Sequence, residues 1–134
     1  MRIIVPIIVG LCVMFFGTRG GTESVAQSTT VTNWFQMLGF FRNINFSLAQ
    51  FIVRKMAHMS EYGLFALTTD WSLAKYDAEK AKYFAFLISF ALAGADELYQ
   101  YTNAGRTGCI QDVLIDVLGA CVGIAIYNLF RKKA

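Results

Sequence analysis

The chain has 134 residues, of which 56% are hydrophobic and one is proline, and its mean hydropathy is +0.48. Such a chain is too apolar and too short for a soluble domain of several layers. Its net charge of +3 is spread over the loops without a basic stripe, so no nucleic acid partner is expected. Composition therefore predicts a small integral membrane protein.

Four hydrophobic segments approach the roughly 20 residues that cross the hydrocarbon core of a bilayer. They predict an all-α integral membrane protein, a single domain over residues 1–134 that forms a four-transmembrane-helix bundle, with helices at about residues 3–19, 52–74, 83–101 and 110–130. The first segment follows Arg2 and also fits a signal peptide with a small-x-small site at Ser24 and Ala26. That site lies about eight residues beyond the apolar core, so the segment is interpreted as a retained helix.

Residues 20–30 between the first two helices are predicted to form a polar loop, and an amphipathic segment follows at about residues 31–48. Aromatic rings favour the headgroup zone of a bilayer. The segment is therefore expected to be interfacial or re-entrant, with a loop packed over the bundle as the alternative. Its aromatic residues are Trp34, Phe35, Phe40, Phe41 and Phe46.

Lysines and arginines favour a topology with both termini in the cytoplasm. In that topology the inner side holds Arg2, Lys75, Lys80, Lys82, Arg131, Lys132 and Lys133, and the outer side holds Arg19, Arg42, Arg54, Lys55 and Arg106. The majority is seven of the twelve basic residues. This majority carries more weight because three of the outer cations, Arg54, Lys55 and Arg106, adjoin a set of polar residues within the helices. These three are interpreted as functional residues and not as plain membrane anchors.

That polar set occupies thirteen positions where a membrane helix should be apolar: Lys55, His58, Glu61, Tyr62, Asp96, Glu97, Gln100, Arg106, Thr107, Gln111, Asp112, Asp116 and Asn128. An ionisable group in the bilayer costs at least about 2.5 to 3.5 kcal/mol, so it normally faces a partner or a water-filled cavity. At about 1.5 Å per residue, Glu61, Asp96 and Asp116 each lie roughly 7 to 9 Å inside the outer helix ends. Three helices are thus predicted to deliver polar groups to one outer-leaflet layer, and a purely structural ion-pair network is the alternative.

Helical spacing places these residues on shared faces. The stripes are Lys55, His58 and Glu61 or Tyr62 on the second helix, Asp96 and Gln100 on the third, and Asp112, Asp116, Gly119 and Gly123 on the fourth. Gly119 and Gly123 form a small-xxx-small pair, which lets a neighbouring helix approach. Asp70 lies near the inner end of the second helix and is interpreted as a capping or snorkelling residue outside the cluster.

The runs RKMAHMSEYGLFAL (54–67) and ADELYQYTNAGRTGCIQDVLIDVLGACVG (95–123) resemble the VanZ family of small bacterial membrane proteins. The family pattern is a Lys-x-x-His-x-x-x-Tyr box, an Asp-Glu-x-x-Gln box, an Arg shortly after it, and two Asp residues before a Gly-rich helix. The matching residues are Lys55, His58, Tyr62, Asp96, Glu97, Gln100, Arg106, Asp112 and Asp116, and Glu61 sits where the family often has an acidic or polar residue. The resemblance covers about residues 50–127. It implies a location in the bacterial inner (plasma) membrane and a role in the cell envelope, because the family is named for a member that confers low-level resistance to the lipoglycopeptide teicoplanin.

Two kinds of site residue are predicted. The candidate catalytic residues are His58, Glu61, Asp96 and Asp112, because a carboxylate that fixes the tautomer of a histidine makes it a general base. The candidate substrate-binding residues are Lys55, Tyr62, Glu97, Gln100, Arg106 and Asp116, in which the two cations would hold a phosphate or carboxylate. An outward-facing pocket of this kind fits a lipid-linked envelope precursor or a phospholipid.

Three functions fit the residues, and the sequence does not decide whether the protein is an enzyme. The first is binding or modification of an envelope lipid, the second is a structural or assembly role for the polar cluster, and the third is a small ion-coupled transporter. No cofactor is expected, although Asp96, Glu97, Asp112 and Asp116 offer oxygen ligands for Mg²⁺ or Ca²⁺. A single histidine and three cysteines without a CxxC motif argue against zinc. The oligomeric state is not predicted.

Overall fold

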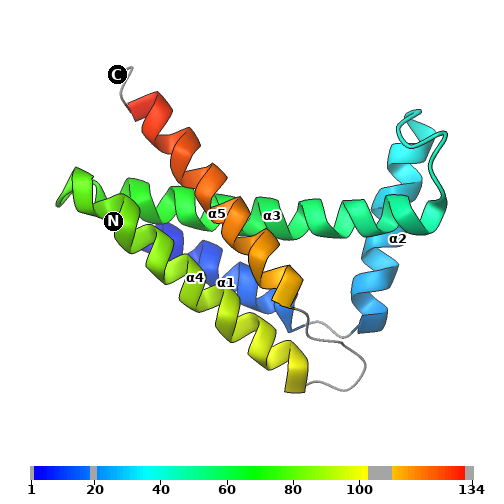
Figure 1. Ribbon diagram of the computed structural model, residues 1–134, viewed down its shortest axis with the longest axis horizontal. Coiled ribbons are helices and arrows are strands. Elements are labelled where there is room, and N and C mark those ends of the chain that lie inside the picture. The colour runs from blue at the N-terminus through cyan, green and yellow to red at the C-terminus, as the bar shows by residue number, and fades with distance from the viewer. Residues whose placement is uncertain (1, 19–20, 103–109, 132–134) are drawn as a thin grey trace.

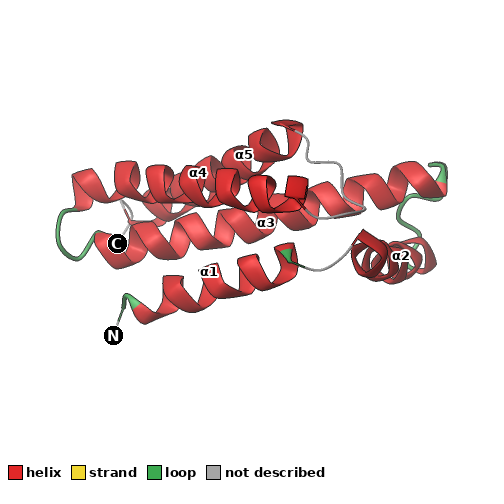
Figure 2. Ribbon diagram, turned by 90° about the horizontal axis from the view of Figure 1, so that it is seen from below, coloured by secondary structure: helices red, strands yellow, loops and turns green. Residues whose placement is uncertain are grey.

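The computed structural model describes residues 2–18, 21–102 and 110–131, which form five α-helices and no strand (Figures 1 and 2). The helices are α1 (Ile4–Gly17), α2 (Gly21–Met37), α3 (Phe46–Leu73), α4 (Ala78–Thr102) and α5 (Ile110–Arg131). The predicted all-α class is confirmed. Within these ranges α5 is the one helix both long and apolar enough to cross a membrane, and α1 is a shorter apolar helix. The longer helices α3 and α4 carry more ionisable side chains.

Helix α3 is the centre of the fold. Helices α1, α4 and α5 pack against it, with α5 crossing it obliquely, whereas α2 crosses it near its N-terminal end, apart from the other helices (Figure 1). The most extensive contact is between α3 and α5. A Cβ added at Gly119 would collide with the backbone of Met59, and one added at Gly123 would collide with the backbone of Gly63. The small-xxx-small pair therefore lets α3 and α5 pack backbone against backbone.

The polarity of the bundle is the reverse of that of a soluble protein. Apart from Val13 and Phe65, its buried side chains are small or polar, and they include Ala66, Ala85, Ser72, Ser89 and Asp70. Large apolar side chains lie on the surface of every helix, among them Ile8, Leu11, Phe51, Leu64, Leu87, Phe90, Leu118 and Phe130. Soluble proteins rarely expose apolar surface on this scale. A lipid surrounding matches this pattern, in agreement with a membrane protein.

The prediction of a polar loop at residues 20–30 is wrong, because α2 begins at Gly21. Hydroxyl groups form hydrogen bonds within this helix. Ser28, Thr29 and Thr32 donate to backbone carbonyls three or four residues earlier. The Gln50 side chain of α3 also donates to Val25 O, Ser28 Oγ and Thr29 Oγ1, at 3.2, 3.2 and 2.7 Å. These bonds fasten α2 to α3.

The amphipathic segment predicted at 31–48 covers the end of α2, a turn and the first residues of α3. The turn places Gly39 at φ 89° and Phe41 at φ 62°. Left-handed backbone is easy for glycine and unusual for phenylalanine. Trp34 and Phe35 are exposed on α2.

Two helices begin earlier than hydrophobicity predicts, because side chains cap them. Asn45 Oδ1 accepts a bond from Ser47 N at 3.0 Å, so α3 starts at Phe46. Asp77 Oδ1 accepts bonds from the backbone N–H groups of Glu79 and Lys80, both at 3.1 Å, and α4 starts at Ala78. Both are N-cap bonds that satisfy donors left free in a first helical turn.

Candidate functional site

Most of the predicted site residues meet where α3, α4 and α5 converge beside the C-terminal end of α1. We call the set Lys55, His58, Glu61, Tyr62, Asp96, Glu97, Gln100, Asp112 and Asp116 the polar cluster. Tyr62, Asp96, Gln100 and Asp116 are buried, and the other five are partly buried. The predicted substrate ligand Arg106 and the neighbouring Thr107 lie outside the described residues.

An ion pair joins α3 to α5 at the edge of the cluster. Lys55 Nζ donates to Asp112 Oδ1, and each side chain is 23% exposed. The ammonium group also lies 5.1 Å from the ring centre of Phe51. Lys55 was predicted to bind a phosphate or carboxylate of the substrate, and in the structure a carboxylate of the protein already occupies that role.

His58 lies next to Asp116, a residue of the neighbouring helix. Its Nδ1 is 3.7 Å from Asp116 Oδ1, and the Asp116 side chain is 4% exposed. This distance is slightly longer than a hydrogen bond. A small side-chain movement would let Nδ1–H donate to the carboxylate, which leaves Nε2 as the basic nitrogen. The sequence placed Asp116 among the substrate ligands, and in the structure it lies beside His58.

Asp96 is enclosed by its own helix and by α1. Gln100 Nε2 donates to Asp96 Oδ2 at 2.7 Å, and both side chains are buried. On the other side lies Gly17, the last residue of α1, where an added Cβ would collide with the Asp96 carboxylate. A glycine at this point therefore makes room for Asp96. Sequence reasoning missed Gly17, because nothing local shows that the end of α1 reaches α4.

Two buried oxygen atoms of the cluster lack a hydrogen-bond partner among the described residues. They are Tyr62 Oη, on a side chain that is 0% exposed, and Asp116 Oδ1. Buried polar atoms are normally bonded, so each unpartnered one calls for an explanation. Water or a polar group of a ligand would supply the missing bonds.

Carboxyl groups outnumber cationic groups in the described part of the cluster. The Asp116 carboxyl group interacts electrostatically with those of Asp96, Asp112, Glu61 and Glu97. These five carboxyl groups face one lysine and one histidine. In the described part of the chain, however, no group of three His, Cys, Asp or Glu side chains is arranged to hold a metal ion.

A cleft of about 570 Å³ opens beside the cluster, between α2 and the N-terminal half of α3. Its walls are largely apolar, with Phe16 from α1, Val31 and Phe35 from α2, and Ile52 and Met56 from α3. His58 and Glu61 also line it, so the polar cluster and the cleft share a boundary. This volume falls in the range of small-molecule sites, roughly 300 to 1,000 Å³. The sequence does not reveal the cleft, because it depends on where α2 crosses α3.

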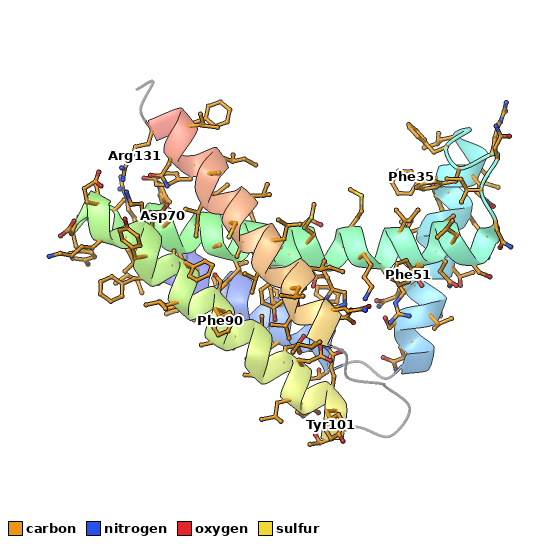
Figure 3. The ribbon with its side chains drawn as sticks, in the orientation of Figure 1. Phe35, Phe51, Asp70, Phe90, Tyr101 and Arg131 are labelled. Atoms are coloured by element: carbon orange, nitrogen blue, oxygen red, sulfur yellow. The ribbon has the colours of Figure 1, made fainter. Side chains whose placement is uncertain are left out.

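Asp70 belongs to a second, smaller polar contact near the opposite end of α3, close to Arg131 in Figure 3. Its carboxylate is 0% exposed and accepts a bond from Asn128 Nδ2 of α5 at 2.6 Å. The interpretation of Asp70 as a capping or snorkelling residue is therefore wrong. The side chain points into the α3–α5 contact, where Asn128 solvates it.

A family model described as VanZ/LLP1 matches residues 3–131, which confirms the resemblance and extends it over all five helices. No curated protein and no solved structure matches the chain.

Proposed function

We propose, because the chain belongs to the VanZ/LLP1 family, that it binds a lipid-linked component of the bacterial cell envelope at the polar cluster. The component lies in the outer leaflet of the plasma membrane, and its binding or modification contributes to low-level resistance to teicoplanin. One observation carries the proposal: three helices bring a histidine, a tyrosine and several carboxyl groups together at the edge of an apolar cleft. A polar site joined to an apolar cleft suits an amphiphile.

The proposed topology has α1, α3, α4 and α5 crossing the bilayer and α2 lying in its outer interface. The apolar side chains on the outer surface of the bundle support the spans, and the crossing of α2 over α3 supports the interfacial position (Figure 1). With 14 residues, α1 is shorter than a full span, a mismatch that local thinning of the bilayer accommodates at modest cost.

Both termini are proposed to be cytoplasmic. The start of α1, the end of α5 and the α3–α4 turn lie at one end of the bundle (Figures 1 and 2). At this end the Arg2 guanidinium lies 5.0 Å from the ring centre of Trp71, and Arg131 Nη1 donates to Ala78 O at 3.0 Å. Cations gathered at one end favour the cytoplasmic side. The polar cluster, at the other end, then faces outward.

The chemistry proposed for the cluster centres on His58. With Nδ1 turned to Asp116, the Nε2 lone pair faces the bound molecule and accepts a proton from a hydroxyl group or a water. Tyr62 and Gln100 supply polar contacts around the same space. Binding requires only this polar surface, whereas modification of the lipid also requires the base.

A structural role is the second candidate, and two contacts favour it. The Lys55–Asp112 ion pair and the Asn128–Asp70 hydrogen bond both join α3 to α5. A cluster that only holds helices together would lose stability on mutation without losing a ligand. The two candidates therefore predict different results for the same variants.

The test compares wild-type protein with His58→Gln in nanodiscs containing phosphatidylglycerol and an undecaprenyl-linked precursor. Lipids extracted after incubation are analysed by mass spectrometry, and thermal unfolding checks the fold. Cys121→Ser, at an exposed position on α5, is the matched control. A mass change that requires His58 establishes an enzyme, and retention of a lipid without a mass change establishes a binding protein. If neither occurs and His58→Gln melts at a lower temperature, the structural candidate holds.

The link to resistance is tested in cells that lack the gene. The wild-type gene should restore the minimum inhibitory concentration of teicoplanin, and His58→Gln at matched membrane levels should not. Full restoration by His58→Gln would remove His58 from the proposed function.

A further inference from the structure

Among the described residues that line the cleft between α2 and α3, Arg54 is the one lysine or arginine. This side chain is partly buried on α3 and lines the cleft together with apolar neighbours. Among the residues that the structure describes, no carboxylate lies within ion-pairing distance of Arg54. The adjacent Lys55, by contrast, is neutralised by Asp112. Of these two neighbouring cations, Arg54 is thus the one available for an anion.

The rest of the cleft is suited to an aliphatic chain. Phe16, Val31, Phe35, Ile52 and Met56 come from three helices and leave an apolar space of about 570 Å³. At one end, the bonds from Gln50 hold α2 against α3. At the other end, His58 and Glu61 open to the polar cluster.

The order of groups along α3 matches an anionic amphiphile. Arg54, His58 and Glu61 lie on one helix face, and at about 1.5 Å per residue His58 is roughly 6 Å and Glu61 roughly 10 Å from Arg54 along the axis. A phosphate bound by Arg54 would therefore place the neighbouring atoms of the headgroup beside His58. Arginine suits this role because its planar fork binds a phosphate through two parallel hydrogen bonds.

We infer that the α2–α3 cleft is the entry and binding site for a membrane lipid phosphate, with its aliphatic chain between α2 and α3 and its phosphate on Arg54. This inference rests on the proposed function and names both the chemical class of the lipid and its recognition residue. A lipid with an added cationic headgroup fits less well, because that group would lie near the guanidinium. The expected ligands are accordingly anionic lipids, not zwitterionic ones.

The experiment is a native mass spectrometry titration of detergent-solubilised protein with phosphatidylglycerol or phosphatidylcholine. Arg54→Gln should weaken phosphatidylglycerol binding by about tenfold, the scale of one charge-assisted contact, and should leave phosphatidylcholine binding unchanged. Arg42→Gln is the matched control, because Arg42 is exposed in the turn before α3 and does not line the cleft. It should bind both lipids as the wild type does. Equal weakening by both variants would overturn the specific role of Arg54.

A second pair of variants tests the cleft itself. Ala57 lines the cleft, so Ala57→Trp should fill it and reduce lipid binding by about tenfold or more. Ala91→Trp is the control, at an exposed position on α4 away from the cleft. Inorganic phosphate at millimolar concentration should not compete with phosphatidylglycerol. Competition by phosphate alone would overturn the part of the inference that requires a lipid chain.

The outcomes separate this inference from the proposed function. If Arg54→Gln and Ala57→Trp bind phosphatidylglycerol normally while His58→Gln loses its effect on an envelope lipid, the cleft inference fails and the proposed function stands. If all three variants match the wild type in lipid binding and lipid modification, both the cleft inference and the proposed function fail. Arg54→Lys, which keeps the charge and loses the fork, should bind with intermediate affinity and replaces Arg54→Gln if that variant does not fold.

Discussion

Replacing Gly123 by alanine should destabilise the protein, because this glycine is where α5 lies closest to α3. The added Cβ would lie 2.7 Å from the carbonyl carbon and 3.0 Å from the Cα of Gly63, and still closer to its carbonyl oxygen. Ordinary contact begins at 3.4 Å, so the carbonyl carbon alone is about 0.7 Å too near. The obstacle is backbone on a facing helix, which no side-chain rotation relieves. Overpacking of this kind typically costs about 1 to 3 kcal/mol.

Gly94→Ala on α4 is the matched control, since an added Cβ there meets nothing within 4 Å. Alanine forms helix more readily than glycine, so this variant should be as stable as the wild type or more stable by up to about 1 kcal/mol. Both proteins are unfolded by titration with a denaturing detergent in mixed micelles, followed by circular dichroism. The free energy of unfolding should fall for Gly123→Ala and not for Gly94→Ala.

The same variant tests the link between packing and the site. Separation of α3 from α5 moves His58 away from Asp116, which is already 3.7 Å distant. Gly123→Ala should therefore also reduce lipid binding or turnover at temperatures where it remains folded. Equal stability and equal binding of the two alanine variants would refute the reasoning that the close α3–α5 contact supports the cluster.

Three further predictions concern single contacts. In a double-mutant cycle of unfolding free energies, Lys55→Met and Asp112→Asn should show a coupling of about 1 kcal/mol, and a coupling near zero would show that this partly exposed pair adds no stability. Backbone and side-chain bonds from Lys80 hold the pKa of Asp77 below its ordinary value. The stabilisation from ionised Asp77 is therefore present above its ordinary pKa and is lost as pH falls through the lowered one. Asp77→Ala should melt below the wild type at neutral pH, and a gap that persisted in strong acid would contradict this account. Asn128→Leu should cost about 1 to 3 kcal/mol of unfolding free energy, because the buried Asp70 carboxylate loses its hydrogen bond. Asp70→Leu combined with Asn128→Leu should recover part of that loss, and a double variant less stable than Asn128→Leu would contradict the explanation.

Hydrophobicity predicted the helices best where no cap extends them. The segment expected at 110–130 agrees closely with α5 (Ile110–Arg131). The starts of α3 and α4 are earlier than predicted, because Asn45 and Asp77 cap each helix ahead of its apolar run. The first turn of α4 is polar, and that of α3 fell in the predicted amphipathic segment. The N-terminal half of α2 was missed for a related reason. Its Ser and Thr residues favour loops, yet their hydroxyl groups bond within the helix and to Gln50 of α3.

Helical spacing correctly indicated which site residues share a face, but not which partner each would meet. That Asp112 neutralises Lys55 depends on the register between α3 and α5, which glycines at 63, 119 and 123 set by close approach. The positions of Gly17 against Asp96 and of α2 beside Arg54 are also tertiary features. No local pattern in the sequence contains that information.

The distribution of carboxyl groups favours the proposed phosphate position at Arg54 over a position within the polar cluster. Beyond His58, the carboxyl groups of Glu61, Asp96, Glu97 and Asp116 lie close together, and with Lys55 paired to Asp112 this region disfavours an anion in a site of low dielectric. A lipid phosphate is therefore more stable on the cleft side of His58, where the wall is apolar and Arg54 has no carboxylate partner among the described residues. His58 then stands between the phosphate and the carboxyl groups, one turn from Arg54 and beside Asp116. In that position its imidazole can exchange a proton with a headgroup on one side while a carboxylate orients it from the other, which is the arrangement that base catalysis requires.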